Sequence, residues 1–162
     1  MSRRPRFLGI HAATLDAEGR IQLPAALRDE LHFKQPDFQL TVSLEGDGSL
    51  ALRDREEWEA WTDALLSARA IPTQLDRRTL LTVAAHSSPV KCDKQGRIRV
   101  PDALLALLGL DRSHPGQREV FLVGAFHELR LWSRSQWETF ADSSRGALGA
   151  GLDRLLQPRL QS

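Results

Sequence analysis

The residues of this chain that could do chemistry come in two matching groups. Residues 15–24 read LDAEGRIQLP and residues 92–101 read CDKQGRIRVP, so that the Asp, the Gly-Arg pair, the Ile and the Pro recur at the same spacing. An arginine guanidinium is always charged and presents a planar set of donors that matches phosphate oxygens and base edges. A repeated arginine beside a turn therefore indicates anion recognition rather than bond-breaking chemistry.

Each group predicts the same local structure of turn, strand and helix. An Asp followed three residues later by Gly is a turn signal, because the carboxylate can accept backbone N–H bonds and Gly adopts a positive φ without steric cost. The segments 20–23 and 97–100 then alternate polar and apolar residues, as a strand with one buried face does. Pro24 and Pro101 fit the first position of a helix. The turn-shaping residues are Asp16, Gly19, Asp93 and Gly96.

The second group carries the stronger local positive charge. In residues 14–22 one arginine, Arg20, stands against Asp16 and Glu18, whereas residues 91–99 have a single acid, Asp93. Taken singly, such an arginine is most simply a solvated strand end paired with its own aspartate. Its repetition at one motif position raises the alternative of contact with DNA, where cations meet phosphates and a two-stranded ribbon can enter the major groove. The candidate contacts in the two groups are Arg20, Lys91, Lys94, Arg97 and Arg99.

A short basic arm precedes the first group. It contains Arg3, Arg4 and Arg6, and either a solvated tail or an arm that reaches DNA is consistent with it. Arg6 is the member of the arm that we retain as a candidate DNA contact.

Overall composition limits the possible partners. The 162 residues include 22 basic and 21 acidic side chains, so the chain is no polycation and any nucleic-acid binding must come from local clusters. Cys92 is the only cysteine, which excludes an internal disulfide and favours a reducing, cytoplasmic location. The longest apolar run, 103–108, is far too short to span a bilayer, and we expect no membrane association.

An enzymatic function finds little support. The five histidines are scattered without a metal-binding spacing, and the lone Cys92 has no recognisable base and orienting partner beyond His86. The glycines of 146–151 follow no predicted strand, which argues against a nucleotide loop. We expect no catalytic site, no cofactor, no metal and no small-molecule substrate.

The remaining pattern predicts an internal duplication. Helices are predicted over 25–32, 54–70 and 72–85, and a hairpin over 38–52 that recurs over 120–131. The hairpins are offset by 79 residues and the turns by 77, which places two extra residues in the loop 111–118 of the second copy.

Four segments follow from this duplication. They are a first repeat over 7–60, a helical connector over 61–84, a second repeat over 85–140 and a C-terminal tail over 141–162. Each copy alone is roughly 50 to 60 residues, a size of marginal independent stability, so the two copies should share one barrel-like core.

Apolar residues outside that core suggest subunit contacts. Trp58, Trp61, Trp132 and Trp137 follow the apolar faces and are interpreted as core or subunit-contact residues. Leucines of the tail recur at helical spacing, but Gly146, Gly149 and Gly151 interrupt them and Pro158 ends them. We expect the tail to be either frayed or held by another subunit.

The doubled turn, the Pro-started short helix, the Gly124 hairpin and a Trp after each hairpin together resemble the MraZ family over about 7–140. That resemblance implies an α+β, β-rich fold made of two AbrB-like (SpoVT-AbrB) domains in a swapped-hairpin, double-psi-like barrel. It also implies DNA contact through Asp16 and Arg20 and through Asp93 and Arg97.

The function implied by the resemblance is sequence-specific transcription regulation. A homo-oligomeric ring, associated with the nucleoid in the cytoplasm, would bind short direct repeats in double-stranded DNA upstream of its division and cell-wall gene cluster. The alternative is an antitoxin-like or scaffold oligomer whose main ligand is another polypeptide, which Trp58, Trp61 and the leucine-rich tail would suit.

Overall fold

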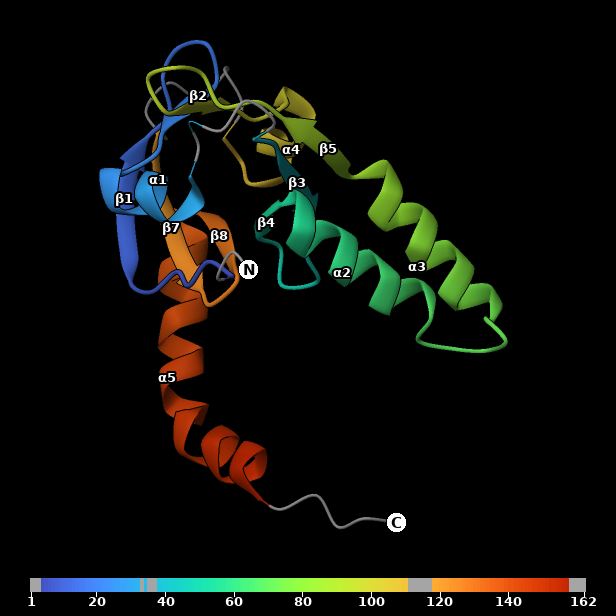
Figure 1. Cartoon of the computed structure of the whole chain (residues 1–162). Helices are drawn as coiled ribbons and strands as arrows, with labels where there is room; N and C mark the ends of the chain where they lie inside the picture. Colours follow the sequence, from blue (N-terminus) through green and yellow to red (C-terminus); the bar gives the residue numbers. More distant parts are fainter. Residues whose placement is uncertain (1–3, 33, 35–37, 111–117, 158–162) are drawn as a thin grey trace.

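The computed structural model describes residues 4–32, 34, 38–110 and 118–157, and its centre is an antiparallel sheet of six strands (Figure 1). The strand order is β1-β7-β8-β4-β3-β5, and a separate two-stranded ribbon pairs β2 with β6. The fold is therefore α+β, as the sequence predicts. The strands are β1 (Ile10–Thr14), β2 (Arg20–Gln22), β3 (Leu40–Leu44), β4 (Leu50–Asp54), β5 (Ser87–Val90), β6 (Arg97–Arg99), β7 (Glu119–Ala125) and β8 (Glu128–Ser133).

Helices follow both the turns and the hairpins. The two short ones begin one residue after the prolines of the repeated groups, so Pro24 and Pro101 lie at the N-cap and not at the predicted first helical position. The first two of the three longer helices lie where the sequence predicts helices, and the third, which follows the second hairpin, is not among the predicted helices. Asp54 accepts the backbone N–H of Glu57 and so caps α2, as its position before the helix predicts. The helices are α1 (Ala25–Leu31), α2 (Arg55–Leu66), α3 (Gln74–Ala85), α4 (Asp102–Leu107) and α5 (Arg134–Leu156).

Strands of the two halves pair with each other across the main sheet. β1, from the first half, pairs with β7, and β5, from the second half, pairs with β3. Ile10 faces Val123 in the first of these pairs, and Leu40 faces Val90 in the second. Each half thus gives its leading strand to the hairpin of the other half.

The core is continuous between the two halves. Ile21 and Ile98 face each other across the ribbon and both are fully buried, as are Leu52 of β4 and Leu131 of β8. Burying one such side chain contributes about 1.5 to 3 kcal/mol, and much of that contact is made with residues of the other half. The prediction of one shared core is confirmed.

A charged group occupies one core position of the first half. Arg53 is 2% exposed and its guanidinium lies 4.1 Å from the ring centre of Trp61. Its Nη2 pairs with Glu45 at 2.9 Å and its Nε lies 2.5 Å from Glu128, while Nη1 donates to the Ser43 hydroxyl. The position that corresponds to Arg53 in the second half is the buried Trp132.

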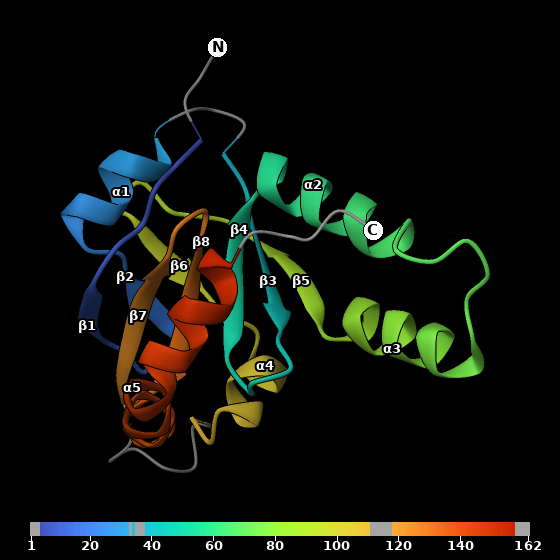
Figure 2. The same cartoon turned by 90° about the horizontal axis from the view of Figure 1, so that it is seen from below.

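Three helices project from the sheet and have no buried residue. α2 and α3 form a helical hairpin that extends to one side, and α5 extends away from the sheet in another direction (Figures 1 and 2). A capping box at Thr73 and Asp76 starts α3 just after the break that the sequence predicts near Pro72.

The prediction for the C-terminal tail is wrong in one respect. The glycines of the tail predict a break in the helical pattern, but α5 continues through them to Leu156. A glycine lowers helix stability by about 1 kcal/mol but, unlike proline, does not block the helix.

Some sequence predictions lie outside the described residues. They concern Arg3, Pro158 and most of the insertion 111–118.

Candidate nucleic-acid interface

The two arginine turns lie side by side because β2 and β6 pair with each other. In the antiparallel register Arg20 faces Arg99, Ile21 faces Ile98 and Gln22 faces Arg97. The isoleucines are buried, so the alternation of a strand places the other four side chains on the outer face. The ribbon and both turns lie together at one end of the molecule, at the top of Figure 1.

Both turns are held by the same set of hydrogen bonds. In the first turn, Asp16 Oδ1 accepts the backbone N–H groups of Glu18 and Arg20, each at 2.9 Å, and Oδ2 accepts Arg20 Nε at 2.8 Å. Asp93 makes the corresponding contacts with Gln95 and Arg97 at the same three distances. Each aspartate therefore fixes its turn and the direction of its arginine side chain at once.

Each turn is also attached to the strand of the other half. Gly19 and Gly96 have φ of 77° and 78°, a conformation that glycine adopts without strain. The Gly96 carbonyl accepts the N–H of Leu23 at 2.9 Å, and the Gly19 carbonyl accepts that of Val100 at 3.3 Å. The two turns thus form one rigid unit.

The hydrogen bonds shift the ionisation of the turn residues. The backbone N–H of Arg20, followed by its side chain, lowers the pKa of Asp16 to about 2, although desolvation acts in the opposite direction. In turn, the hydrogen bond to Asp16 raises the pKa of Arg20. For Asp93 desolvation is the largest influence and opposes ionisation, but the hydrogen bonds from Arg97 and Gln95 together hold its pKa below the ordinary value. Both aspartates are carboxylates near neutral pH.

Three further cations lie in the second copy. Lys91, Lys94 and Arg99 are exposed, and their side chains form no hydrogen bond or ion pair within the part of the chain that the structure describes. The equivalent positions in the first copy hold Thr14, Ala17 and Gln22, which are neutral. One arginine against two acids gives residues 14–22 a charge of −1, and four basic residues against one acid give residues 91–99 a charge of +3.

Two residues of the first half support the second turn. Gln22 Nε2 donates to the Gln95 carbonyl at 2.8 Å, and Arg28 Nη1 of α1 donates to the same oxygen at 3.3 Å. A Cβ at Gly96 would lie 2.2 Å from Cδ of Arg28, so the arginine side chain lies directly over the turn. Helical periodicity alone places Arg28 on the solvent face, and only the pairing of β2 with β6 reveals this contact.

The basic arm is at the other end of β1. Phe7 pairs with Phe126 in the hairpin between β7 and β8, and the backbone N–H of Arg6 donates to Glu30 at 2.7 Å. Arg4 pairs with Glu57 of α2. The structure therefore does not bring Arg6 together with the ribbon arginines.

The side chains considered for enzymatic chemistry are not arranged as a site. Burial, more than the neighbouring Asp93, raises the pKa of the Cys92 thiol to about 11, which keeps it protonated and unreactive. His86 Nδ1 is 2.8 Å from the Thr82 carbonyl, within its own helix end. Among the described residues, no group of His, Cys, Asp and Glu could hold a metal ion.

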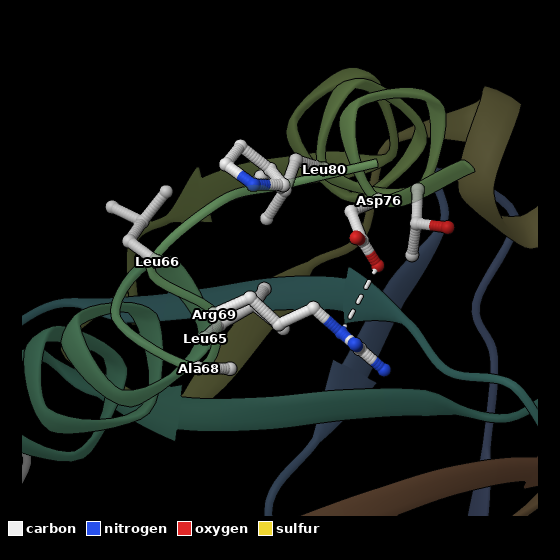
Figure 3. Close-up of a pocket in the computed structure, with 8 residues that line it drawn as sticks. Leu65, Leu66, Ala68, Arg69, Asp76 and Leu80 are labelled. Atoms are coloured by element: carbon white, nitrogen blue, oxygen red, sulfur yellow. Dashed lines mark ion pairs between the residues drawn. The ribbon is translucent and has the colours of Figure 1, made fainter. Parts of the chain in front are cut away.

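A hollow between α2 and α3 is distinct from the ribbon (Figure 3). Leu65, Leu66 and Leu80 contribute its apolar lining, and Arg69 Nε lies 3.7 Å from Asp76 Oδ1. These groups close the helical hairpin and offer no set of converging polar groups to a ligand. Within the described ranges, none of the helices is both long and apolar enough for a membrane span.

Comparison with known proteins places the chain in a family. The protein-family model described as "MraZ protein, putative antitoxin-like" matches residues 7–81 and again residues 83–157. The chain belongs to the MraZ family. The resemblance inferred from the doubled turn is thereby confirmed, and a family of transcriptional regulators is not a class of enzymes.

Three MraZ relatives, each named transcriptional regulator MraZ, illustrate the similarity. The chain is 34% identical to that of Desulforapulum autotrophicum over 77% of its own length and 78% of the relative. It is 32% identical to that of Pseudomonas savastanoi pv. phaseolicola over 88% of its own length and 89% of the relative. It is 30% identical to that of Cutibacterium acnes over 87% of its own length and 91% of the relative.

Proposed function

We propose that this protein, whose MraZ relatives are named transcriptional regulators, regulates transcription by sequence-specific binding to DNA, and that the β2–β6 ribbon is its DNA-contacting surface. The observation that carries the proposal is the charge of +3 on residues 91–99, whose Lys91, Lys94 and Arg99 side chains are exposed beside the ribbon. The phosphates of a nucleic-acid backbone are the anions that such a cluster of cations binds.

The proposed contacts fall into two classes, those with base edges and those with phosphates. A two-stranded ribbon enters the major groove, where arginine forms bidentate bonds to guanine. Arg99, exposed on the outer face, would reach base edges, while Arg97, Lys91 and Lys94 at the second turn would meet phosphates. Arg6 would contact DNA only where the duplex passes the other end of β1, because its backbone is bonded to Glu30.

We further propose that the protein acts as a ring-shaped homo-oligomer on direct repeats upstream of its own division and cell-wall gene cluster, at the nucleoid in the cytoplasm. The supporting observation is the exposed apolar surface of the projecting helices. Linked modest sites raise avidity by about 10² to 10⁴ without new contacts. The exposed apolar side chains include Leu66, Leu75, Leu81, Leu148, Leu152 and Leu155.

The strand exchange supports a more specific description of the fold. We propose that 7–60 and 85–140 are two AbrB-like units whose hairpins are swapped into a double-psi-like barrel. In this description 61–84 is a helical connector and 141–162 a tail. The pairing of β1 with β7 and of β5 with β3 is the exchange that such a barrel requires.

The test is binding to the duplex upstream of the protein's own gene over a salt series. Losing one phosphate contact in Arg97→Ala should flatten the slope of log affinity against log salt by roughly 0.9. Arg77→Ala removes an equal charge from the exposed face of α3 and should leave affinity and slope unchanged. If Arg20→Ala and Arg97→Ala combined behave like the unaltered protein, the ribbon is not the DNA-binding surface.

The competing function is binding to another polypeptide, which the same exposed helices would suit. It predicts that the purified, nuclease-treated protein forms a stoichiometric complex with a small protein encoded beside it. It also predicts that the combined arginine substitutions leave that complex intact. A native mass measurement separates this complex from a homo-oligomer.

A further inference from the structure

The two turns differ in one contact that the motif arginine makes. In the first turn Glu18 Oε2 lies 2.5 Å from Arg20 Nη2, which completes an ion pair. In the second turn the equivalent residue is Gln95, whose Oε1 accepts from Arg97 Nη2 at 2.6 Å. The two side chains occupy the same place on the guanidinium, but one carries a negative charge and the other does not.

This difference changes the charge that an approaching phosphate meets. Arg20 is bound by two carboxylates, Asp16 at Nε and Glu18 at Nη2, so its positive charge is more than balanced locally. Arg97 is bound by one carboxylate, Asp93, and by a neutral amide. The arginine side chains themselves are equally accessible, at 31% and 30% exposed. The two turns therefore differ in the charge bound to the arginine and not in the exposure of the arginine side chain.

From this contact we propose that Glu18 prevents Arg20 from acting as a phosphate contact, so that each subunit holds DNA through its second turn. This inference rests on the proposed DNA-binding function and assigns unequal roles to its two arginine turns. Glu18 acts through Arg20 as an internal anion that occupies the place of a phosphate oxygen. A phosphate can reach Nη2 only by displacing it.

The acidic residue that makes the two turns different is Glu18 and not the aspartate of the motif. Asp16 and Asp93 make identical contacts with the backbone of their turns, so they cannot produce a difference between them. Asp102 adds a further negative charge near the first turn, because its Oδ1 would lie 3.5 Å from a Cβ at Gly19. At the second turn the neighbouring charged residue is instead Arg28, which covers Gly96. The surroundings of the two turns thus reinforce the difference made by Glu18.

The experiment exchanges the two residues in the full-length protein and measures binding to the upstream duplex over a salt series. Glu18→Gln should tighten binding roughly tenfold, the effect of one charge-assisted hydrogen bond. It should also steepen the salt slope by roughly 0.9 per subunit engaged. Gln95→Glu should weaken binding and flatten the slope by similar amounts. Glu59→Gln removes the same charge from α2, which Figure 1 shows apart from the ribbon, and should change neither.

A double substitution shows whether the effect passes through Arg20. In an Arg20→Ala background, Glu18→Gln should bring no gain, because no guanidinium remains to be released. A gain that persists there would show an effect of overall charge and overturn the inference. Unchanged affinity in Glu18→Gln, with binding lost in Arg97→Ala, would also overturn it while the proposed function stands. If neither Arg97→Ala nor Gln95→Glu alters binding, the ribbon is not the DNA-contacting surface, and if the unaltered protein does not bind the duplex at all, the proposed function itself is wrong.

Discussion

The two halves of the chain place different side chains at equivalent points of nearly the same backbone. Position 53 in the first hairpin is a buried arginine over Trp61, and position 132 in the second is a buried tryptophan whose ring centre lies 4.8 Å from that of Phe140. A guanidinium stacked on an aromatic ring and a second aromatic ring fill similar space. The duplication therefore preserves the shape of the core and leaves its polarity open to change.

The turns show the same division between backbone and side chains. Their aspartates and glycines make matching hydrogen bonds, yet residues 14–22 and 91–99 differ by four units of charge, from −1 to +3. The repeated residues are those that set geometry, and the residues that differ are those that set the electrostatic potential at the ribbon. Two copies of one motif can thus have different roles without any change of fold.

The largest expected effect concerns the buried arginine. Arg53→Ala should lower the free energy of unfolding by about 2 to 5 kcal/mol, because it removes a buried side chain stacked on Trp61 and one of the two arginines that pair with Glu45 and Glu128. Urea denaturation at neutral pH measures the loss. Arg53→Met, which fills the space without the charge, should lower the free energy of unfolding by less than Arg53→Ala does. A loss below about 1 kcal/mol in Arg53→Ala would show that the network does not stabilise the first half.

The turn glycines should give the next largest effect. Gly19→Ala and Gly96→Ala each place a side chain at positive φ, which costs about 1 to 2 kcal/mol. Gly96→Ala should cost more, because its Cβ must also displace Arg28, whereas the nearest atoms to a Cβ at Gly19 are at 3.5 Å. Gly46→Ala, in an open turn, is the control. Equal losses at the two turn glycines would contradict the role of Arg28 over the second turn.

A smaller effect should appear at Gln22. Gln22→Leu removes the bond to the Gln95 carbonyl and should cost about 0.5 to 1.5 kcal/mol in thermal or urea unfolding. Arg99→Leu, at the equivalent position of the second copy, should stay within about 0.5 kcal/mol, since Arg99 is exposed. If the two substitutions cost the same, Gln22 does not support the second turn.

The smallest effect is the pH dependence of the first turn. The carboxyl of Asp16 should titrate near pH 2 in the folded protein, against 3.8 without the turn. Because the folded pKa is the lower one, its stabilisation is complete above about pH 4 and is lost as the pH falls through 2. Carbon-detected NMR of the side-chain carboxyl measures the midpoint, and Arg20→Ala should move it upward. A midpoint at 3.8 would mean that the turn bonds are absent in solution.

Local features of this fold are predictable from sequence because neighbouring residues determine them. The Asp-Gly turns, the Pro-started helices and the Asp54 cap each depend on contacts within a few positions. The exchange of β1 and β5 between the halves depends on pairings far apart in the chain, and no local pattern encodes it. The position of Arg28 over Gly96 follows from the pairing of β2 with β6, which also joins residues far apart in the chain, and no local pattern indicates it.

The pairing of β1 with β7 has a consequence during protein synthesis. Ile10 and Val123 are neighbours in the sheet, so the first strand cannot find its partner until more than three quarters of the chain has left the ribosome. A product that ends between β6 and β7 would contain both strands of the ribbon and the cations of the second copy, but β1 would have no partner in the sheet. The main sheet, unlike the ribbon, is therefore completed only after β7 and β8 have been made.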